Sequence, residues 1–280
     1  MKAEQIFFMG TGTVGRECLG ILKNAAGGMP IECLAMEKEQ IPAMEPLCRR
    51  LEVPYRNLQT KDVKELLLQQ ERETLIISAH NEYLFPKEVI EKPNMRIINF
   101  HNAYLPDYRG RNAPTWAIYE GAEYGGATWH EVEPSIDTGD IIVQEKVAIR
   151  EDETGLSLLM RSAKAGIKLL REHVREFLNG EYRLKRPRRR GILYLSGDIP
   201  NEGYLEPAWD MEQAYRFLRA LDYSPLNILP MPRVRLGEKE YEISGYDIQK
   251  VKCPGGGQKT FKIRSQDGML ELVCSLMEVK

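Results

Sequence analysis

Short apolar runs alternate with amphipathic segments through the first half of the chain, and this alternation restricts the fold more than any other feature. Runs with the length of buried strands occupy residues 6–9, 31–36, 53–55, 75–78 and 96–100. The segments between them carry apolar residues at spacings of three and four, the period of a helix packed on a core. This order predicts an α/β fold with a doubly wound, mostly parallel sheet and helices on both faces. Ligands of such sheets bind at the carboxyl ends of the strands.

The pattern changes after residue 126. Two β-like runs, residues 127–132 and 141–149, are joined by a polar loop. A long amphipathic helix is predicted next, with Thr154 available to cap its start and Asn179 near its end. These elements extend the first unit of the fold.

A basic segment separates this unit from the rest of the chain. Residues 183–190 read RLKRPRRR, with six positive charges in eight positions, and are predicted to form a linker. Beyond them, an amphipathic helix at residues 211–221 precedes short β-like runs that glycine and proline interrupt, which is typical of a small barrel or sandwich. We therefore expect a catalytic domain over residues 1–182, a basic linker over 183–190 and a smaller β-rich domain over 191–280.

The composition argues against several classes of protein. The 280 residues carry a net charge of −2, so the molecule as a whole is not drawn toward nucleic acid or an anionic membrane. No apolar run approaches the roughly 18 residues of a membrane helix, and the first residues do not resemble a secretory leader. The five cysteines show neither metal-ligand nor redox spacing. We expect a cytoplasmic protein that needs no metal, membrane or obligate protein partner.

A glycine-rich turn follows the first predicted strand. Residues 10–15 read GTGTVG and open a helix, and Glu37 lies close to where a ribose-binding acid is found in dinucleotide-binding folds. A nicotinamide-dependent oxidoreductase is therefore one possible function. Alternatively, the glycines permit close packing of helix on strand, or the helix N-terminus binds a phosphate of another ligand. On that last interpretation, Gly10 and Gly12 contact the substrate.

The segment richest in chemistry lies at the end of the fifth predicted strand. Asn99 and His101 are two residues apart, so they share one face of an extended chain, and Asp137 arrives from a separate loop. An amide can stabilise a developing oxyanion, an imidazole can move protons near neutral pH, and a carboxylate can orient it. This trio suits acyl transfer to an amine without a metal. His80 can line the same cleft, whereas His130 is expected to be structural.

This segment resembles the folate-dependent formyltransferases, which include methionyl-tRNA formyltransferase and the nucleotide-sugar N-formyltransferases. The family pattern is Asn-x-His-x-x-x-Leu-Pro-x-Tyr-Arg-Gly, followed by a second loop with Asp-x-Gly-Asp. The matching residues here are Asn99, His101, Leu105, Pro106, Tyr108, Arg109, Gly110, Asp137, Gly139 and Asp140. The resemblance covers residues 1 to about 180. It implies that the chain transfers the formyl group of 10-formyltetrahydrofolate to a primary amine, with Asn99, His101 and Asp137 as the catalytic residues.

The resemblance also implies two groups of binding residues. Folate contacts are expected from the loop after the fourth strand and from the loop that carries the catalytic aspartate, namely Tyr83, Leu84, Phe85, Ile136 and Asp140. The acceptor side is expected to include Arg109, Gly110, Arg111 and Asn112. Two arginines beside a catalytic loop suit the recognition of a phosphate or a carboxylate.

The acceptor is less well defined by the sequence. The C-terminal unit resembles, through residues 214–225, the OB-like domain of methionyl-tRNA formyltransferases, and RLKRPRRR could contact a phosphate backbone. However, the long basic insertion that the tRNA enzymes carry after the second strand is replaced by the short acidic MEKEQIPAMEP, and residues 128–131 look more like enzymes that act on small amines. We predict a small anionic amine, such as an amino sugar nucleotide or an amino-acid-like compound, with methionyl-tRNA as the alternative. The intact Asn99, His101 and Asp137 argue against a family member that binds its ligands without turnover.

Overall fold

The computed structural model describes residues 2–36, 44–250 and 259–278, and the chain folds into two compact units. The first unit comprises the residues up to Gly110 together with Gly126–Val147 and Arg161–Leu193. The second comprises Arg111–Gly125, Ala148–Met160 and the residues from Tyr194 onward. Within the described ranges, no helix is long and apolar enough to cross a membrane.

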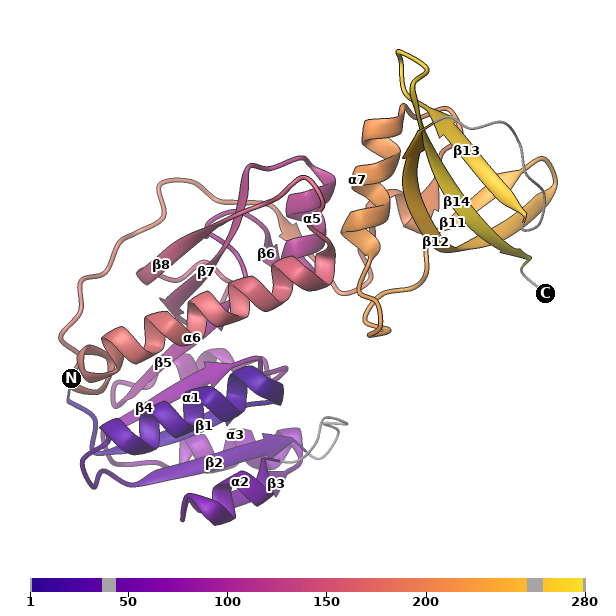
Figure 1. The fold of residues 1–280 in the computed structure, drawn as a ribbon. Helices are drawn as coiled ribbons and strands as arrows, with labels where there is room; N and C mark the ends of the chain where they lie inside the picture. Colours follow the sequence, from indigo (N-terminus) through magenta and orange to yellow (C-terminus); the bar gives the residue numbers. More distant parts are fainter. Residues whose placement is uncertain (1, 37–43, 251–258, 279–280) are drawn as a thin grey trace. The chain divides into compact units, whose positions relative to one another are not determined.

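A seven-stranded mixed sheet forms the centre of the first unit (Figure 1). Its strand order is β3-β2-β1-β4-β5-β7-β8. The strands are β1 (Gln5–Gly10), β2 (Ile31–Met36), β3 (Tyr55–Leu58), β4 (Thr74–Ala79), β5 (Met95–His101), β7 (Tyr124–Glu131) and β8 (Ile141–Ala148). Neighbouring strands from β3 to β5 are parallel, and β5 pairs with β7 in the antiparallel sense. The predicted mostly parallel sheet is confirmed, and each of its predicted strands is present, although β3 begins later than expected, at Tyr55.

Helices cover both faces of this sheet. They are α1 (Gly12–Ala25), α2 (Glu45–Arg50), α3 (Thr60–Leu68), α4 (Lys87–Ile90) and α6 (Gly155–Asn179). On one face, Phe7, Ile76 and Ile97 share a buried cluster with apolar side chains of α3 and α4. On the other face, Gly166 of α6 lies against the ring of Phe100. The side chains of β5 therefore alternate between two covered faces, as the period of two in a strand requires.

The direction in which successive strands are added to the sheet reverses between β1 and β4. Strands β2 and β3 lie on one side of β1, and β4, β5, β7 and β8 lie on the other. Parallel α/β sheets bind their ligands at such a point, outside the carboxyl ends of the strands. The carboxyl ends here are Gly10 of β1, Ala79 of β4 and His101 of β5. Pairing of β4 with β5 places Ser78 beside Asn99, and pairing of β5 with β7 places Asn99 opposite His130. The register alone thus gathers polar side chains from three strands.

The second unit contains a five-stranded sheet with the order β10-β11-β12-β14-β13. Its strands are β10 (Tyr204–Leu205), β11 (Arg233–Leu236), β12 (Lys239–Lys250), β13 (Thr260–Arg264) and β14 (Leu270–Glu278). Helix α7 (Met211–Leu221) contributes Phe217 and Leu218 to the buried cluster under this sheet, where they meet Leu272 of β14. The predicted β-rich C-terminal domain is confirmed at this level. Helix α5 (Ala113–Tyr119) and the 3₁₀ helix Pro200–Gly203 were not predicted, because each is too short to show a period.

Two very short strands complete the described structure. Strand β6 (Arg109–Gly110) pairs with β9 (Leu193–Tyr194). The four described cysteines, Cys18, Cys33, Cys48 and Cys274, are buried and are not joined in disulfides, and Cys253 lies outside the described residues.

Candidate active site

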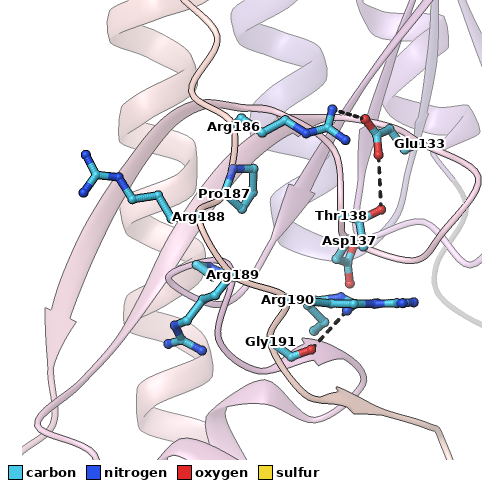
Figure 2. A pocket seen from close by; sticks show the side chains of 11 residues that line it. Glu133, Asp137, Thr138, Arg186, Pro187, Arg188, Arg189, Arg190 and Gly191 are labelled. Atoms are coloured by element: carbon cyan, nitrogen blue, oxygen red, sulfur yellow. Dashed lines mark hydrogen bonds and ion pairs between the residues drawn. The ribbon is translucent and has the colours of Figure 1, made fainter.

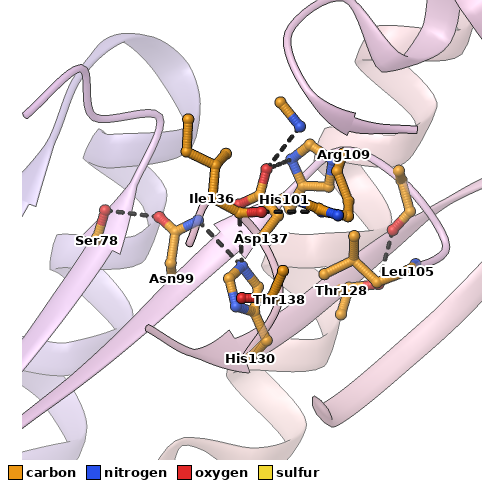
Figure 3. Close-up of polar contacts among 12 residues, drawn as sticks. Ser78, Asn99, His101, Leu105, Arg109, Thr128, His130, Ile136, Asp137 and Thr138 are labelled. Carbon is orange, nitrogen blue, oxygen red and sulfur yellow. Dashed lines mark hydrogen bonds and ion pairs between the residues drawn. The ribbon is translucent and has the colours of Figure 1, made fainter. Parts of the chain in front are cut away.

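Asn99, His101 and Asp137 lie together at the end of β5 (Figure 3). Asn99 and His101 share the face of β5 that the i, i+2 spacing predicts, and His101 is 8% exposed. Asp137 comes from the loop between β7 and β8. One of its carboxylate oxygens lies 3.5 Å from Nδ1 of His101. The structure therefore places the three residues in one buried polar cluster.

The loop that carries Asp137 is fixed by main-chain contacts. The backbone N–H of Gly110 donates to Oδ2 of Asp137 at 2.8 Å, and the N–H of Glu131 donates to the carbonyl oxygen of Asp140 at 2.9 Å. A Cβ atom on Gly139 would lie 1.7 Å from the carbonyl oxygen of Glu131, so only glycine fits there. These contacts give a physical reason for the Asp-x-Gly-Asp pattern of the loop.

The carboxyl of Asp137 is held in its charged form. Burial by itself raises its pKa, but the positive charge on His101, the hydrogen bond and charge of His130 and the N–H of Gly110 outweigh burial. The net effect lowers the pKa of Asp137 well below its usual range. A fixed negative charge thus faces both imidazoles throughout the physiological pH range.

His130 was expected to be structural, yet the structure places it in the same cluster. Nδ2 of Asn99 lies 3.2 Å from Nε2 of His130, and the same nitrogen of His130 lies 3.4 Å from Oδ1 of Asp137. Ser78 adds a further contact, since its hydroxyl donates to Oδ1 of Asn99 at 2.7 Å. Neither Ser78 nor His130 was predicted as a site residue. Their only signal in the sequence is strand alternation, which becomes informative once the pairing partners of β5 are known.

The hydrogen bonds assign the protons of the two imidazoles. Nε2 of His101 lies 2.8 Å from the carbonyl oxygen of Tyr108, and Nδ1 of His130 lies 2.8 Å from that of Glu131. A carbonyl oxygen only accepts, so each of these nitrogens carries a hydrogen. The remaining nitrogen of each ring faces Asp137, and it is protonated only when that ring is positively charged. The carboxylate therefore lies beside the nitrogen of each ring at which a proton can be gained or lost.

The predicted folate residues fall into a buried group and an exposed group. Tyr83 and Phe85 pack edge to face, with ring centroids 5.1 Å apart, beside the core cluster of the first unit. Burial raises the pKa of Tyr83 to about 12, and its buried hydroxyl has no hydrogen-bond partner among the described residues. In contrast, Leu84 is 73% exposed and Ile136 is 36% exposed. Asp140 is half-buried and lies 3.4 Å from a guanidinium nitrogen of Arg186.

The glycine-rich turn packs against the end of β4. A Cβ atom on Gly10 would lie 2.4 Å from the carbonyl oxygen of Ala79, so close packing alone requires glycine there. The hydroxyl of Thr11 donates to the carbonyl oxygen of His80 at 2.8 Å. The imidazole of His80 is bound to Asn102, and burial lowers its pKa, so it is neutral at pH 7. Gly12 has a positive φ, and no described atom apart from its chain neighbours and the backbone of its own helix lies within 4 Å of where its Cβ would be. Glu37, the proposed ribose-binding acid, lies outside the described residues.

The residues predicted for the acceptor side are divided between the two units and have different partners. Arg109 is 2% exposed; its Nε donates to the carbonyl oxygen of Ile136 at 2.9 Å and its Nη1 to that of Gly191 at 3.0 Å. Burial and the nearby charge of Arg190 lower the pKa of Arg109. Gly110 binds Asp137 as described above. Arg111 and Asn112 belong to the second unit, in which the N–H of Arg111 donates to the carbonyl oxygen of Tyr194.

A pocket of about 310 Å³ opens beside Asp137 (Figure 2). It is strongly basic and is formed by the loop that carries Asp137 and by the segment that was predicted as a linker. Its lining residues are Pro106, Arg109, Glu133, Asp137, Thr138, Arg186, Pro187, Arg188, Arg189, Arg190 and Gly191. In the part of the chain that the structure describes, no group of three or more His, Cys, Asp or Glu residues is arranged to hold a metal ion.

The structure thus combines an α/β sheet, a polar cluster at the carboxyl end of β5 and a basic pocket beside that cluster. The sequence profile of the family described as Formyl transferase matches residues 15–174, which is more than half of the chain. The chain therefore belongs to the formyl transferase family. Of the two enzyme classes that the sequence left open, this match supports formyl transfer rather than hydride transfer.

Two kinds of formyltransferase are similar to this chain in sequence. The GDP-perosamine N-formyltransferase of Brucella melitensis is 28% identical over 181 residues, which are 65% of this chain and 68% of the relative. The methionyl-tRNA formyltransferase of Myxococcus xanthus is 27% identical over 196 residues, 69% of this chain and 59% of the relative. Among solved structures, an N-formyltransferase from Helicobacter canadensis in complex with folinic acid and dTDP-3-aminofucose has a TM-score of 0.74 at 14% identity, and covers 98% of this chain and 99% of its own. The last similarity concerns the fold alone.

Proposed function

We propose that this protein transfers the formyl group of 10-formyltetrahydrofolate to the amine of a nucleotide-linked amino sugar, with Asn99, His101 and Asp137 as its catalytic residues. The observation that carries the proposal is their buried cluster at the carboxyl end of β5, in which an ionised carboxylate faces an imidazole at 3.5 Å. When bound, the folate supplies the formyl carbon. The residues of the chain supply the charges and the proton transfers.

Asn99 is suited to stabilise negative charge on the formyl oxygen. Its side-chain amide has two N–H donors, of which one points to His130. In the described structure the other has no partner, so it is free for the substrate. Ser78 fixes the orientation of the amide through Oδ1. A donor that is oriented before the reaction stabilises a developing oxyanion without a cost of reorganisation.

His101 is suited to take the proton that the attacking amine must lose and to return a proton to the leaving nitrogen of the folate. Because Nε2 donates to the carbonyl of Tyr108, the proton is gained and lost at Nδ1. Asp137 stabilises the charged imidazole and holds its orientation, while its own lowered pKa keeps it from taking the proton permanently. His101 would thus carry a proton from the attacking amine to the leaving nitrogen of the folate.

Two observations support the proposed folate contacts. The buried hydroxyl of Tyr83 lacks a partner in the described structure, and a heteroaromatic ring with polar edges could provide one. Leu84 and Ile136 are exposed apolar side chains, and a bound ligand would cover them. We keep Tyr83, Leu84, Phe85, Ile136 and Asp140 as proposed folate residues, and Gly10, Gly12, Arg109, Gly110, Arg111 and Asn112 as proposed acceptor residues.

The choice of a sugar nucleotide rests on two kinds of support. The relative from Brucella melitensis is named for a nucleotide sugar, and the solved structure from Helicobacter canadensis contains one. The basic pocket beside Asp137 also suits a substrate that carries phosphate. Methionyl-tRNA remains the second candidate, because the relative from Myxococcus xanthus is nearly as similar.

The C-terminal β-rich unit has the five strands of an OB-like fold, and we propose that fold for it. We likewise propose 1–182, 183–190 and 191–280 as the limits of catalytic domain, basic segment and C-terminal domain. Limited proteolysis followed by mass spectrometry would locate these limits.

The function is tested by incubating the protein and 10-formyltetrahydrofolate with a panel of amino sugar nucleotides, amino acids and, separately, charged initiator tRNA. We expect the mass gain of one formyl group on at least one sugar nucleotide. Formylation of methionyl-tRNA with none on the panel would refute the proposed acceptor and leave the reaction class intact. No formylation of any amine, despite folate binding, would refute the reaction class.

A further inference from the structure

The basic segment, residues 183–190, is anchored at both ends. Near its start, Lys185 and Ile141 exchange two backbone hydrogen bonds of 2.9 and 3.0 Å. Just beyond its end, the guanidinium of Arg109 donates to the carbonyl oxygen of Gly191 at 3.0 Å. The backbone of the segment is therefore held as a strap beside the loop that carries Asp137, with its arginines projecting from an anchored chain.

Gly191, which forms the second anchor, has no room for a side chain. A Cβ atom on Gly191 would lie 1.6 Å from the carbonyl oxygen of Pro106, which follows the catalytic strand. The strap is thus in direct backbone contact with the loop after His101. A linker with a purely connecting role has no need of such a close approach.

Positive charge dominates the pocket beneath this strap. Five arginines line it against two carboxylates, an excess of three positive charges. Four of those arginines belong to the strap, namely Arg186, Arg188, Arg189 and Arg190. Asp137 lines the same pocket, so an anion bound there would lie close to the catalytic cluster. A volume of about 310 Å³ is at the lower end of small-molecule sites and fits a sugar with its phosphates.

The arginines of the strap divide into two pairs. Arg186 forms an ion pair with a carboxylate that lines the pocket (Figure 2), and Arg189 also forms an ion pair. Arg188 and Arg190 form no ion pair with any residue that the structure describes, and both are exposed. The carboxylate partners are Glu133 and Asp140 for Arg186, and Asp107 for Arg189. Two positive charges at the pocket are thus left uncompensated.

We infer that Arg188 and Arg190 bind the diphosphate of the acceptor, and that this strap makes the enzyme selective for diphosphate-linked amino sugars. The inference rests on the proposed function. A diphosphate diester carries two negative charges and presents the planar oxygen pairs that guanidinium groups bind bidentately. Arg109, which the sequence suggested as the anion anchor, instead uses Nε and Nη1 to hold the catalytic loop and the strap.

Binding to the full-length protein tests the inference without turnover. Calorimetry would measure the dissociation constants of inorganic pyrophosphate and of a nucleoside diphosphate for the wild type, Arg188→Ala, Arg190→Ala and the double variant. Since one charge-assisted contact is worth about a factor of 10 in affinity, we expect about 10-fold weaker binding for each single variant and about 100-fold for the double variant. Arg183→Ala is the matched control: it removes the same charge from the same segment outside the pocket, and it should bind as the wild type does.

The kinetics provide a second readout. For the sugar nucleotide that is formylated, KM should rise in the double variant while kcat stays within about threefold, because neither arginine is among the proposed catalytic residues. Arg190→Lys should recover part of the affinity, since it keeps the charge and loses the planar fork. Folate binding, measured by fluorescence, should not change.

Several outcomes separate this inference from the proposed function. Unchanged KM and pyrophosphate affinity in the double variant, with sugar nucleotides still formylated, would overturn the inference alone. An equal loss in Arg183→Ala would also overturn it, because it would indicate attraction by the net charge of the segment. If no sugar nucleotide is formylated but pyrophosphate binding depends on Arg188 and Arg190, the anion site stands and the acceptor is wrong. A different result would point to a tRNA contact: formylation of methionyl-tRNA that depends on salt and on all the basic residues of the segment, and with which pyrophosphate does not compete. That result would overturn the inference.

Discussion

His130 offers a sharp test of the site, because its position follows from the three-dimensional structure and not from its sequence context. Replacing it by alanine removes Nε2, which accepts from Asn99 Nδ2 at 3.2 Å when the ring is neutral and donates to Oδ1 of Asp137 at 3.4 Å when the ring is protonated. A hydrogen bond to a charged group is worth about 1.5–3 kcal/mol, and Asn99 keeps its second anchor at Ser78. We therefore expect His130→Ala to lower kcat/KM by roughly 10–150-fold.

The assay must separate catalysis from folding. His130 is 2% exposed, so its truncation should also lower the free energy of unfolding by about 2–3 kcal/mol. Rates would be measured per folded protein, with the folded fraction taken from circular dichroism and the active fraction from folate titration. His173→Ala is a suitable control, because His173 lies on α6 and pairs only with Glu176 among the described residues. That control should keep the wild-type rate.

A second variant identifies how His130 acts. In His130→Gln, the side-chain oxygen can accept from Asn99, but the side chain cannot carry a positive charge. Recovery of most of the rate in His130→Gln would show that His130 positions Asn99. No recovery, with a changed pH profile of kcat/KM, would show that its charge matters. Near-native rates in His130→Ala would refute the reasoning, because they would mean that the contacts with Asn99 and Asp137 are dispensable.

Two further predictions concern the catalytic loop. Because the folded-state pKa of Asp137 is lowered, its contribution to stability is complete above the ordinary aspartate pKa of about 4 and is lost as pH falls through the folded-state value. The difference in unfolding free energy between wild type and Asp137→Asn should thus shrink as the pH falls below about 4, as denaturant titrations would show. A difference that keeps growing below about pH 4 would contradict the lowered pKa. Gly139→Ala should cost about 1–3 kcal/mol of stability and displace Asp137, because its Cβ would meet the carbonyl oxygen of Glu131 at 1.7 Å; unchanged thermal unfolding and activity would show that the loop adapts.

Local periodicity explains which features could be predicted from the sequence. The strands of the first unit and the long helix α6 were predicted because each repeats a pattern over enough residues. The shared face of Asn99 and His101 likewise follows from the period of two in a strand. The approach of Asp137 to His101 is different, because no periodicity links the two residues: chemistry and the family resemblance suggested the pair, and the structure places them together.

Features that depend on pairing between distant segments were not accessible from the sequence. His130 reaches Asn99 through the antiparallel register of β5 and β7, which no local pattern encodes. The segment at residues 183–190 has the composition of a solvated linker, and only its backbone bonds to Ile141 and the close approach of Gly191 show that it is fixed. The same holds for Arg109, whose burial and carbonyl partners are properties of the folded chain.

The most direct test of the central proposal follows a labelled formyl carbon. Wild-type protein and the variants Asn99→Ala, His101→Ala and Asp137→Asn would be mixed, in a single turnover, with 10-formyltetrahydrofolate labelled at the formyl carbon and a sugar nucleotide from the panel. We expect the wild type to place the label on the acceptor amine. The His101 and Asn99 variants should be slower by roughly 10²–10⁴-fold while their folate affinity is retained. Transfer of the label by His101→Ala at a near-native rate would contradict the assignment of the site.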